Sequence, residues 1–327
     1  MSSIILSTNL PNVGCIEEEV PMDFPPLKSS INRRQAIAGI AGAAFATANA
    51  HGKDEKSFII DTHLHCFAGG ASKDFPYHPD APYRPEAPAT PEHLLKLMTE
   101  AGIDRAIVVH PEPYQDDHRY LEHCLKVGKE KLKGTCLFFA GRPKNEENLK
   151  KLANSVPLVA LRIHAYNPDR LPPFGKPELK AMWKLAADFG LAVQLHFEPR
   201  YAEGFTTLIQ EFPKVPVLVD HLGRPFQGTA KEHETVLKWS RWDHVTVKLS
   251  SLPNNNSYPH RKPDEIVQIL LKRFGASRLM YGGGYSSTAT AVSYKHERER
   301  LVKMLGSVTE AEVAQILGGN ARKLFQF

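Results

Sequence analysis

The sequence predicts a single-domain (β/α)8 TIM barrel, and three observations carry that prediction. Short apolar runs bounded by turn residues recur eight times, and amphipathic stretches with a helical period separate them. The eight units occupy about 250 residues, which is the usual size of this fold. Strands that alternate with helices favour βαβ units and a parallel sheet. A doubly wound sheet is the alternative, but it does not require eight units.

The predicted elements follow in chain order. The strands are the eight apolar runs, namely Phe58–His63, Arg105–His110, Gly134–Phe139, Leu158–His164, Ala192–Phe197, Pro216–His221, Val245–Ser250 and Arg278–Gly283. Stretches with helical periodicity lie between them, among them Pro91–Ala101, Pro177–Phe189, Glu234–Trp242, Asp264–Phe274 and His296–Leu305. A last helix over Thr309–Leu317 and a short tail complete the chain.

The first fifty residues are expected to precede the barrel as a leader. Arg33 and Arg34 come before a run of small residues that ends in Ala48-Asn49-Ala50. A charged pair, a weakly apolar segment and an A-x-A site resemble a twin-arginine export signal. We therefore expect residues 1–50 to be removed and residues 51–327 to reach the periplasm. A frayed Ala-rich helix on a cytoplasmic protein is the alternative.

Composition excludes several other classes of protein. The chain has 41 basic and 36 acidic residues, a formal net charge of +5, and both signs are interspersed. This pattern argues against nucleic-acid binding. The sequence contains no run of about 18 apolar residues, so it predicts no membrane span. We expect a small-molecule substrate as the partner, and the sequence leaves a homo-oligomer open.

Strand alternation gathers polar side chains inside the predicted barrel. One face of each strand meets the helices and the other fills the interior, and active sites lie at the carboxyl ends of the strands. The inward or end-of-strand polar residues are Asp61, His63, His65, Arg162, His164, His196, Asp220, His221 and Lys248. Four of the histidines, His63, His65, His196 and His221, are expected to converge on one rim, and neutral imidazole is a good ligand for Zn²⁺. The pattern predicts a metal site in which three protein ligands and a water hold the ion.

Several segments resemble one enzyme family. The segment Phe58–His65 looks like the first-strand signature of the amidohydrolase superfamily. Further segments are similar to the sugar-lactone and pyrone-dicarboxylate lactonase branch of the amidohydrolase-related family, namely Ala89–Arg105, Gln194–His196, Val219–Pro225, Val247–Ser250 and Gly319–Phe325. The resemblance runs from about residue 57 to the end of the chain. It implies that His63, His65 and His196 bind a divalent metal, zinc in the first place and manganese as the alternative. That branch also includes members that work without a metal.

One position departs from the family pattern. The resemblance places an aspartate general base after the eighth strand, but Gly284 stands there, and no acid lies between Ser277 and His296. Another group could serve as the base, and His221, Glu198 and Asp61 are the candidates. The chain could instead catalyse a different reaction, or bind its ligand without turnover.

Cations at inward or rim positions predict an anionic substrate. We expect Arg162, Lys248, Arg224 and His164 to contact it, because guanidinium groups pair with carboxylates in two-point geometry. An internal ion pair with Asp61, Asp220 or Glu198 is the alternative for these cations. The predicted function is a hydrolase that opens a lactone or similar ester, with His221 and Arg162 as catalytic residues. A decarboxylase of the same family and an inactive sugar-acid binding protein are the alternatives.

Overall fold

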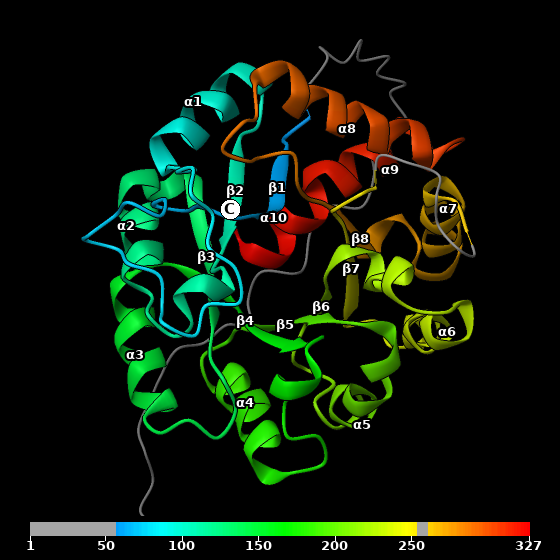
Figure 1. The fold of residues 1–327 in the computed structure, drawn as a ribbon. Coiled ribbons are helices and arrows are strands. Elements are labelled where there is room, and N and C mark those ends of the chain that lie inside the picture. Colours follow the sequence, from blue (N-terminus) through cyan, green and yellow to red (C-terminus); the bar gives the residue numbers. More distant parts are fainter. Residues whose placement is uncertain (1–56, 254–260) are drawn as a thin grey trace, which may run out of the picture. The chain divides into compact units, whose positions relative to one another are not determined.

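Eight parallel strands, paired in chain order from β1 to β8, form the centre of the molecule (Figure 1). The computed structural model describes residues 57–253 and 261–327, so the predicted leader lies outside the described residues. The strands are β1 (Ile60–Leu64), β2 (Arg105–Val109), β3 (Leu132–Leu137), β4 (Leu158–Ala165), β5 (Ala192–Phe197), β6 (Val217–Val219), β7 (Val245–Leu249) and β8 (Leu279–Tyr281). This arrangement confirms the predicted (β/α)8 barrel.

Helices surround the strands on the outside (Figure 1). They are α1 (Pro91–Ala101), α2 (Arg119–Gly128), α3 (Asn145–Ser155), α4 (Pro177–Asp188), α5 (Glu203–Glu211), α6 (Ala230–Lys238), α7 (Pro263–Phe274), α8 (Ala291–Leu305), α9 (Glu310–Ala314) and α10 (Asn320–Phe325). Within the described residues, no helix is long and apolar enough to cross a membrane.

Two helices begin earlier than predicted because capping residues set their start. Thr229 and Thr290 each form a capping box, so α6 begins at Ala230 and α8 at Ala291. The predicted helix over Thr309–Leu317 is interrupted. It continues from α9 into a π-helical turn over Gln315–Gly319.

The buried side chains form two clusters with different positions. The larger cluster lies between the strands and the helices and includes Val193, Leu195 and Val247, as their alternation predicts. The smaller cluster combines Ile60 and Ile107 with Phe325 of α10 and further apolar residues. This apolar packing fills one part of the barrel interior, so the inward polar residues gather elsewhere along the strands.

The first strand contains a bulge that the alternation did not predict. The pairing of β1 with β2 shifts register between Asp61 and Leu64, so one extra residue stands in β1. Ile60 packs in the interior cluster, and the Asp61 carboxylate accepts hydrogen bonds from Tyr294 of α8 and from the Gly283 backbone N–H. The inward orientation predicted for Asp61 is therefore wrong.

Candidate functional site

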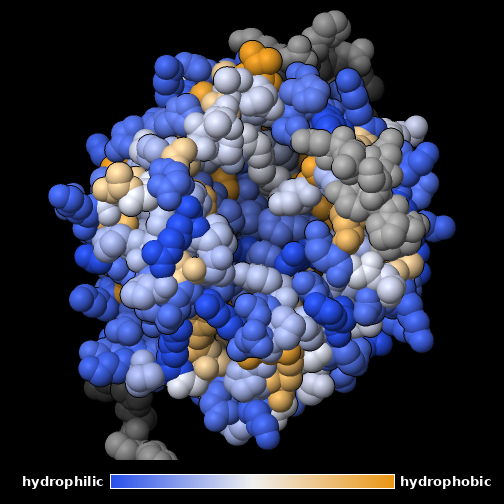
Figure 2. Space-filling model, viewed as in Figure 1, coloured by the Kyte–Doolittle hydropathy of each residue, from blue (hydrophilic) through white to orange (hydrophobic). Residues whose placement is uncertain are grey.

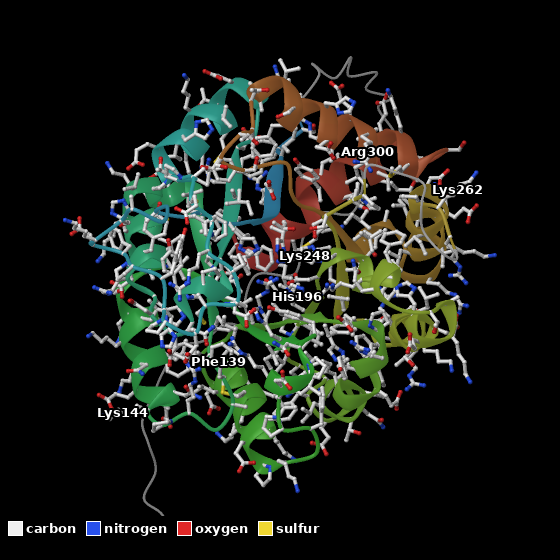
Figure 3. The ribbon with its side chains drawn as sticks, in the orientation of Figure 1. Phe139, Lys144, His196, Lys248, Lys262 and Arg300 are labelled. Carbon is white, nitrogen blue, oxygen red and sulfur yellow. The ribbon has the colours of Figure 1, made fainter. Side chains whose placement is uncertain are left out.

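A hollow with a hydrophilic lining opens at the centre of the molecule (Figure 2). His196 and Lys248 lie within the ring of strands at its centre (Figure 3). A cavity of about 330 Å³, which we call the histidine pocket, is lined by His63, His65 and His221 together with residues of the β1–α1 and β8–α8 connections. A smaller cavity beside it contains His196 and Arg224 and shares His221.

Asp220, at the end of β6, is the central carboxylate of the site. It is 1% exposed and accepts hydrogen bonds from Arg162 Nε at 3.0 Å and Gln194 Nε2 at 3.1 Å. Its other oxygen lies 3.1 Å from His63 Nδ1 and 3.9 Å from Lys248 Nζ. Burial alone would raise the pKa of Asp220, but His63 and Arg162 lower it well below its usual value. The carboxylate is therefore ionised and orients its neighbours.

His63 and His65 have the surroundings expected of metal ligands. His63 Nδ1 faces Asp220, and its Nε2 is buried with no hydrogen-bond partner among the described residues. His65 Nδ1 lies 2.7 Å from the Val109 carbonyl oxygen. A histidine whose first nitrogen donates to a protein oxygen presents the lone pair of its second nitrogen to an ion. Burial lowers the pKa of both rings, that of His65 to about 3, so both are neutral at pH 7.

His196 has different surroundings, because a guanidinium group faces each of its ring nitrogens. Arg162 Nη2 lies 2.6 Å from Nδ1, and Arg224 Nη1 lies 2.9 Å from Nε2. A neutral imidazole has only one accepting nitrogen, so it cannot accept from both arginines. In this arrangement neither nitrogen of His196 is open to a metal. Among the described residues, the group of possible ligands whose donor atoms all lie within 4.8 Å of one another is His63, Asp220 and His221.

Arg224 is the cation that has no close acidic partner. No carboxylate lies within ion-pair distance of it in the described part of the chain, and it stacks 5.4 Å above the ring of Tyr166. His221, Leu222 and Arg224 all have positive φ values, from 52° to 60°, which is costly for residues with side chains. This strained turn after β6 places His221 and Arg224 side by side on the rim.

Lys248 lies at the bottom of the polar network. It is fully buried and donates to the Thr62 carbonyl at 2.9 Å and to Gln194 Oε1 at 2.7 Å. Burial lowers its pKa to about 8. Its Nζ also lies 3.9 Å from Asp220 Oδ1, one of the carboxylates named in the alternative of an internal ion pair.

Glu112 and Tyr166 belong to the site, although the sequence analysis did not select them. Glu112 lies beyond β2, is 4% exposed and accepts a hydrogen bond from the Tyr166 hydroxyl. Its carboxylate is 3.4 Å from His164 Nδ1. Tyr166 in turn stacks on His196 with ring centroids 5.0 Å apart. The signal available in the sequence was the position of Glu112, just past the end of a predicted strand.

The three candidate bases occupy different places. Glu198 is ion-paired with Arg200, and Asp61 lies behind β1 with its pKa raised to about 6 by burial. His221 lines the histidine pocket, and its Nδ1 lies 2.9 Å from Ser250 Oγ. Burial, together with Arg162 and Arg224, lowers the pKa of His221 to about 3, so it is neutral at pH 7.

The glycines after β8 are fixed by their neighbours. Gly284 has φ +114°, and a Cβ atom there would lie 2.5 Å from Tyr294 Cδ2. The ring of Tyr294 and the positive φ therefore leave no room for an acid at Gly284.

The comparisons with known proteins identify the family of the chain. A family model described as amidohydrolase matches residues 60–327, so the chain belongs to the amidohydrolase family. Among curated relatives, an L-fucono-1,5-lactonase from Burkholderia ambifaria is 27% identical over 70% of this chain and 80% of its own length. A 4-sulfomuconolactone hydrolase from Rhizobium radiobacter is also 27% identical, over 69% of this chain and 74% of its own.

Solved structures support the fold. A probable 2-pyrone-4,6-dicarboxylic acid hydrolase from Acinetobacter baumannii, with citric acid bound, has a TM-score of 0.68 at 20% identity and covers 82% of this chain and 99% of its own. A zinc-bound amidohydrolase from Burkholderia multivorans has a TM-score of 0.66 at 16% identity, covering 83% and 99%. The family predicted from the sequence motifs is confirmed.

Proposed function

We propose that this protein is a hydrolase that opens a lactone carrying an anionic group. The observation that carries the proposal is the pair of guanidinium groups at His196, beside a pocket lined by His63, His65 and His221. Arg162 is neutralised by Asp220, whereas Arg224 lies at the rim with no carboxylate within ion-pair distance among the described residues. The names of the curated relatives, a lactonase and a lactone hydrolase, support the same reaction class.

The roles of the residues follow from their surroundings. Arg224 would bind the anionic group of the substrate, and Arg162, held by Asp220, would orient it. The lactone carbonyl would then lie over His63 and His65 in the histidine pocket. His221 would accept the proton of the attacking water, because it is neutral and lines that pocket.

A divalent metal fits part of this site. His63 and His65 would hold it, and His221, whose ring centroid lies 4.3 Å from that of His63, would stay off the metal as the proton acceptor. A bound zinc would polarise the carbonyl and lower the pKa of water. His196 would join the ligands only after Arg224 leaves its Nε2 atom.

The test is to measure ring opening of a panel of lactones, with proton release at constant pH as the readout. Wild type should open a carboxylated lactone such as D-glucarolactone. His63→Asn and His221→Asn should each lower kcat/KM by a factor of about 100 or more, as expected for loss of a positioned catalytic group. His296→Asn, a change at an exposed histidine of α8, is the matched control and should keep full activity.

Two results would count against the proposal. Carbon dioxide release from an unsaturated acid without lactone opening would identify a decarboxylase. Tight binding of the panel without turnover would identify a binding protein.

A further inference from the structure

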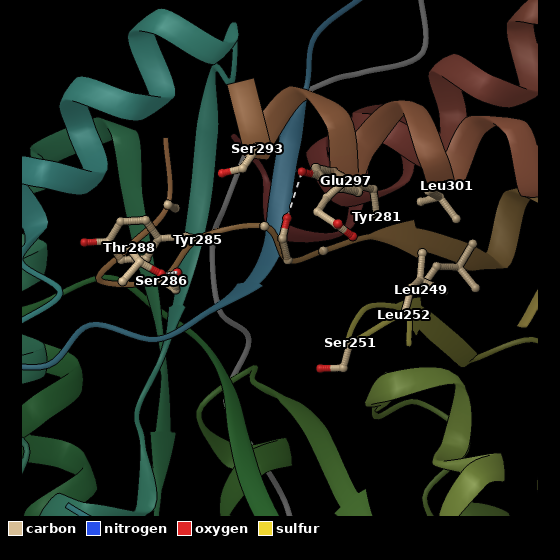
Figure 4. Close-up of a pocket in the computed structure, with 14 residues that line it drawn as sticks. Leu249, Ser251, Leu252, Tyr281, Tyr285, Ser286, Thr288, Ser293, Glu297 and Leu301 are labelled. Atoms are coloured by element: carbon tan, nitrogen blue, oxygen red, sulfur yellow. Dashed lines mark hydrogen bonds between the residues drawn. The ribbon is translucent and has the colours of Figure 1, made fainter. Parts of the chain in front are cut away.

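Three cavities at the carboxyl ends of the strands differ in the charge of their linings. Among the described residues, no lysine or arginine lines the histidine pocket or the cavity of about 400 Å³ between β7, β8 and α8 (Figure 4). The cavity in Figure 4 is lined instead by the carboxylate of Glu297. The third cavity, beside the histidine pocket, is lined by Arg224. The position of the Arg224 guanidinium group therefore decides where an anionic group of the substrate would bind.

The side chain of Arg224 needs support to keep one position. A long side chain loses rotamer freedom when it binds a ligand, and packing that fixes it beforehand lowers this cost. Among the described residues, two rings contact the guanidinium group. Its Nη1 atom lies 2.9 Å from His196 Nε2, and its central carbon lies 5.4 Å from the ring centre of Tyr166. The second distance is within the range of a cation–π interaction.

The ring of Tyr166 is held against that of His196. The two rings stack with their centroids 5.0 Å apart and their planes 25° from parallel. Tyr166 directly follows β4, and β4 pairs with β5 in a register that places His164 opposite His196. Two neighbouring strands therefore position both rings, and Arg224 contacts the surface that the rings form together.

Glu112 fixes the other end of the tyrosine. The Tyr166 hydroxyl donates a hydrogen bond to the Glu112 carboxylate, which belongs to a residue that is 4% exposed. The same carboxylate lies 3.4 Å from His164 Nδ1 and 3.6 Å from Arg170 Nη1. A buried carboxylate with three polar partners forms a rigid network. Glu112 therefore anchors the hydroxyl at a fixed point of the barrel rim.

We propose that Glu112 and Tyr166 are positioning residues that hold Arg224 in place for the anionic group of the substrate. Glu112 fixes the hydroxyl of Tyr166, the ring of Tyr166 supports the guanidinium group, and Arg224 makes the contact with the substrate. This inference rests on the proposed function, in which Arg224 binds the anionic group. Neither Glu112 nor Tyr166 takes part in the chemical step.

The experiment measures the ratio of kcat/KM for D-glucarolactone, which carries a carboxylate, to that for D-gluconolactone, which does not. A loss of folded protein affects both lactones equally and cancels in this ratio. Tyr166→Leu should lower the ratio about threefold to tenfold, the effect of losing a cation–π contact. Tyr166→Phe keeps the ring and loses the hydroxyl, so its ratio should lie between those of wild type and Tyr166→Leu. Tyr201→Leu, at a tyrosine whose ring centre lies 5.0 Å from the Arg200 guanidinium, is the matched control and should keep the wild-type ratio.

A double-mutant cycle tests whether Tyr166 acts through Arg224. In an Arg224→Gln background, Tyr166→Leu should not lower the ratio further, because the group that it positions is gone. An equal loss in both backgrounds, or an unchanged ratio in Tyr166→Leu, would overturn the proposal. A ratio in Tyr166→Phe as low as that in Tyr166→Leu would assign the effect to a direct contact of the hydroxyl with the substrate and would also overturn it. A wild-type ratio in Tyr166→Phe would overturn the role of Glu112.

The outcomes separate this inference from the proposed function. If wild type opens neither lactone, the proposed function fails, and calorimetric binding of D-glucarate then tests the positioning alone. Binding that is weaker in Tyr166→Leu than in wild type, with no further loss in the Arg224→Gln background, supports the positioning role. Equal binding by wild type and Tyr166→Leu, or no binding by wild type, overturns it.

Discussion

The two sides of the barrel rim differ in how many charged side chains they carry. The side formed by β4, β5 and β6 is charged and closely connected, with Asp220 in contact with Arg162, Gln194 and His63. The side formed by β8 has three glycines and no ionisable group between Arg278 and Lys295 other than Tyr281, Tyr285 and Tyr294. Under the proposed function, the first side supplies the charges for binding and proton transfer, and the second side supplies space.

The largest effect should come from the centre of the charged side. Asp220→Ala would leave Arg162 and Lys248 buried without their common counter-charge. We expect the free energy of unfolding to fall by about 3–5 kcal/mol, measured by urea denaturation, together with loss of lactone opening. Asp243→Ala, at an exposed position, should change neither. A stable and active Asp220→Ala protein would show that the network is not essential.

Alanine substitutions in the glycine segment after β8 should lower the free energy of unfolding by amounts that depend on the space at each position. Gly284→Ala should cost about 2–4 kcal/mol, from the positive φ and the contact with Tyr294. Gly283→Ala should cost only about 1 kcal/mol, because its φ is also positive but its Cβ would lie 3.8 Å or more from its neighbours, without a clash. Thermal unfolding of the pair measures the difference. Gly284→Asp should be destabilised and gain no activity, and a gain would show that an acid fits at this position after all.

The charged side should also make stability depend on pH. Burial lowers the pKa of His63 well below its usual value of 6.5, so the unfolded state binds a proton that the folded state excludes. Stability should therefore be complete above pH 6.5 and decline as the pH falls, by up to about 1.4 kcal/mol per pH unit for each such histidine. His63→Asn should show a shallower decline in urea titrations between pH 7 and pH 4. If the free energy of unfolding of His63→Asn fell with pH as steeply as that of wild type, the pH dependence would come from groups other than His63. The control His296→Asn should match wild type.

Strand order, the barrel and the helix periods could be predicted, because each depends on local hydrophobic patterns. The bulge in β1 could not, because the alternation of five residues does not reveal where an extra residue enters the register. Nor could the contacts of His196, which depend on the register that pairs Arg162 with Gln194 and His164 with His196 across β4 and β5. Glu112 was missed because it follows its strand in a turn and not in the alternating pattern.

The central claim is that the charged side binds an anionic group through Arg224. The most direct measurement is the ratio of kcat/KM for D-glucarolactone to that for D-gluconolactone, which lacks the carboxylate, in wild type and Arg224→Gln. Arg241→Gln, at an exposed arginine that stacks on Trp242, is the control. The account predicts a ratio well above one in wild type and a fall of about 10- to 100-fold in Arg224→Gln, the size of a charge-assisted hydrogen bond. An unchanged ratio in Arg224→Gln would contradict it.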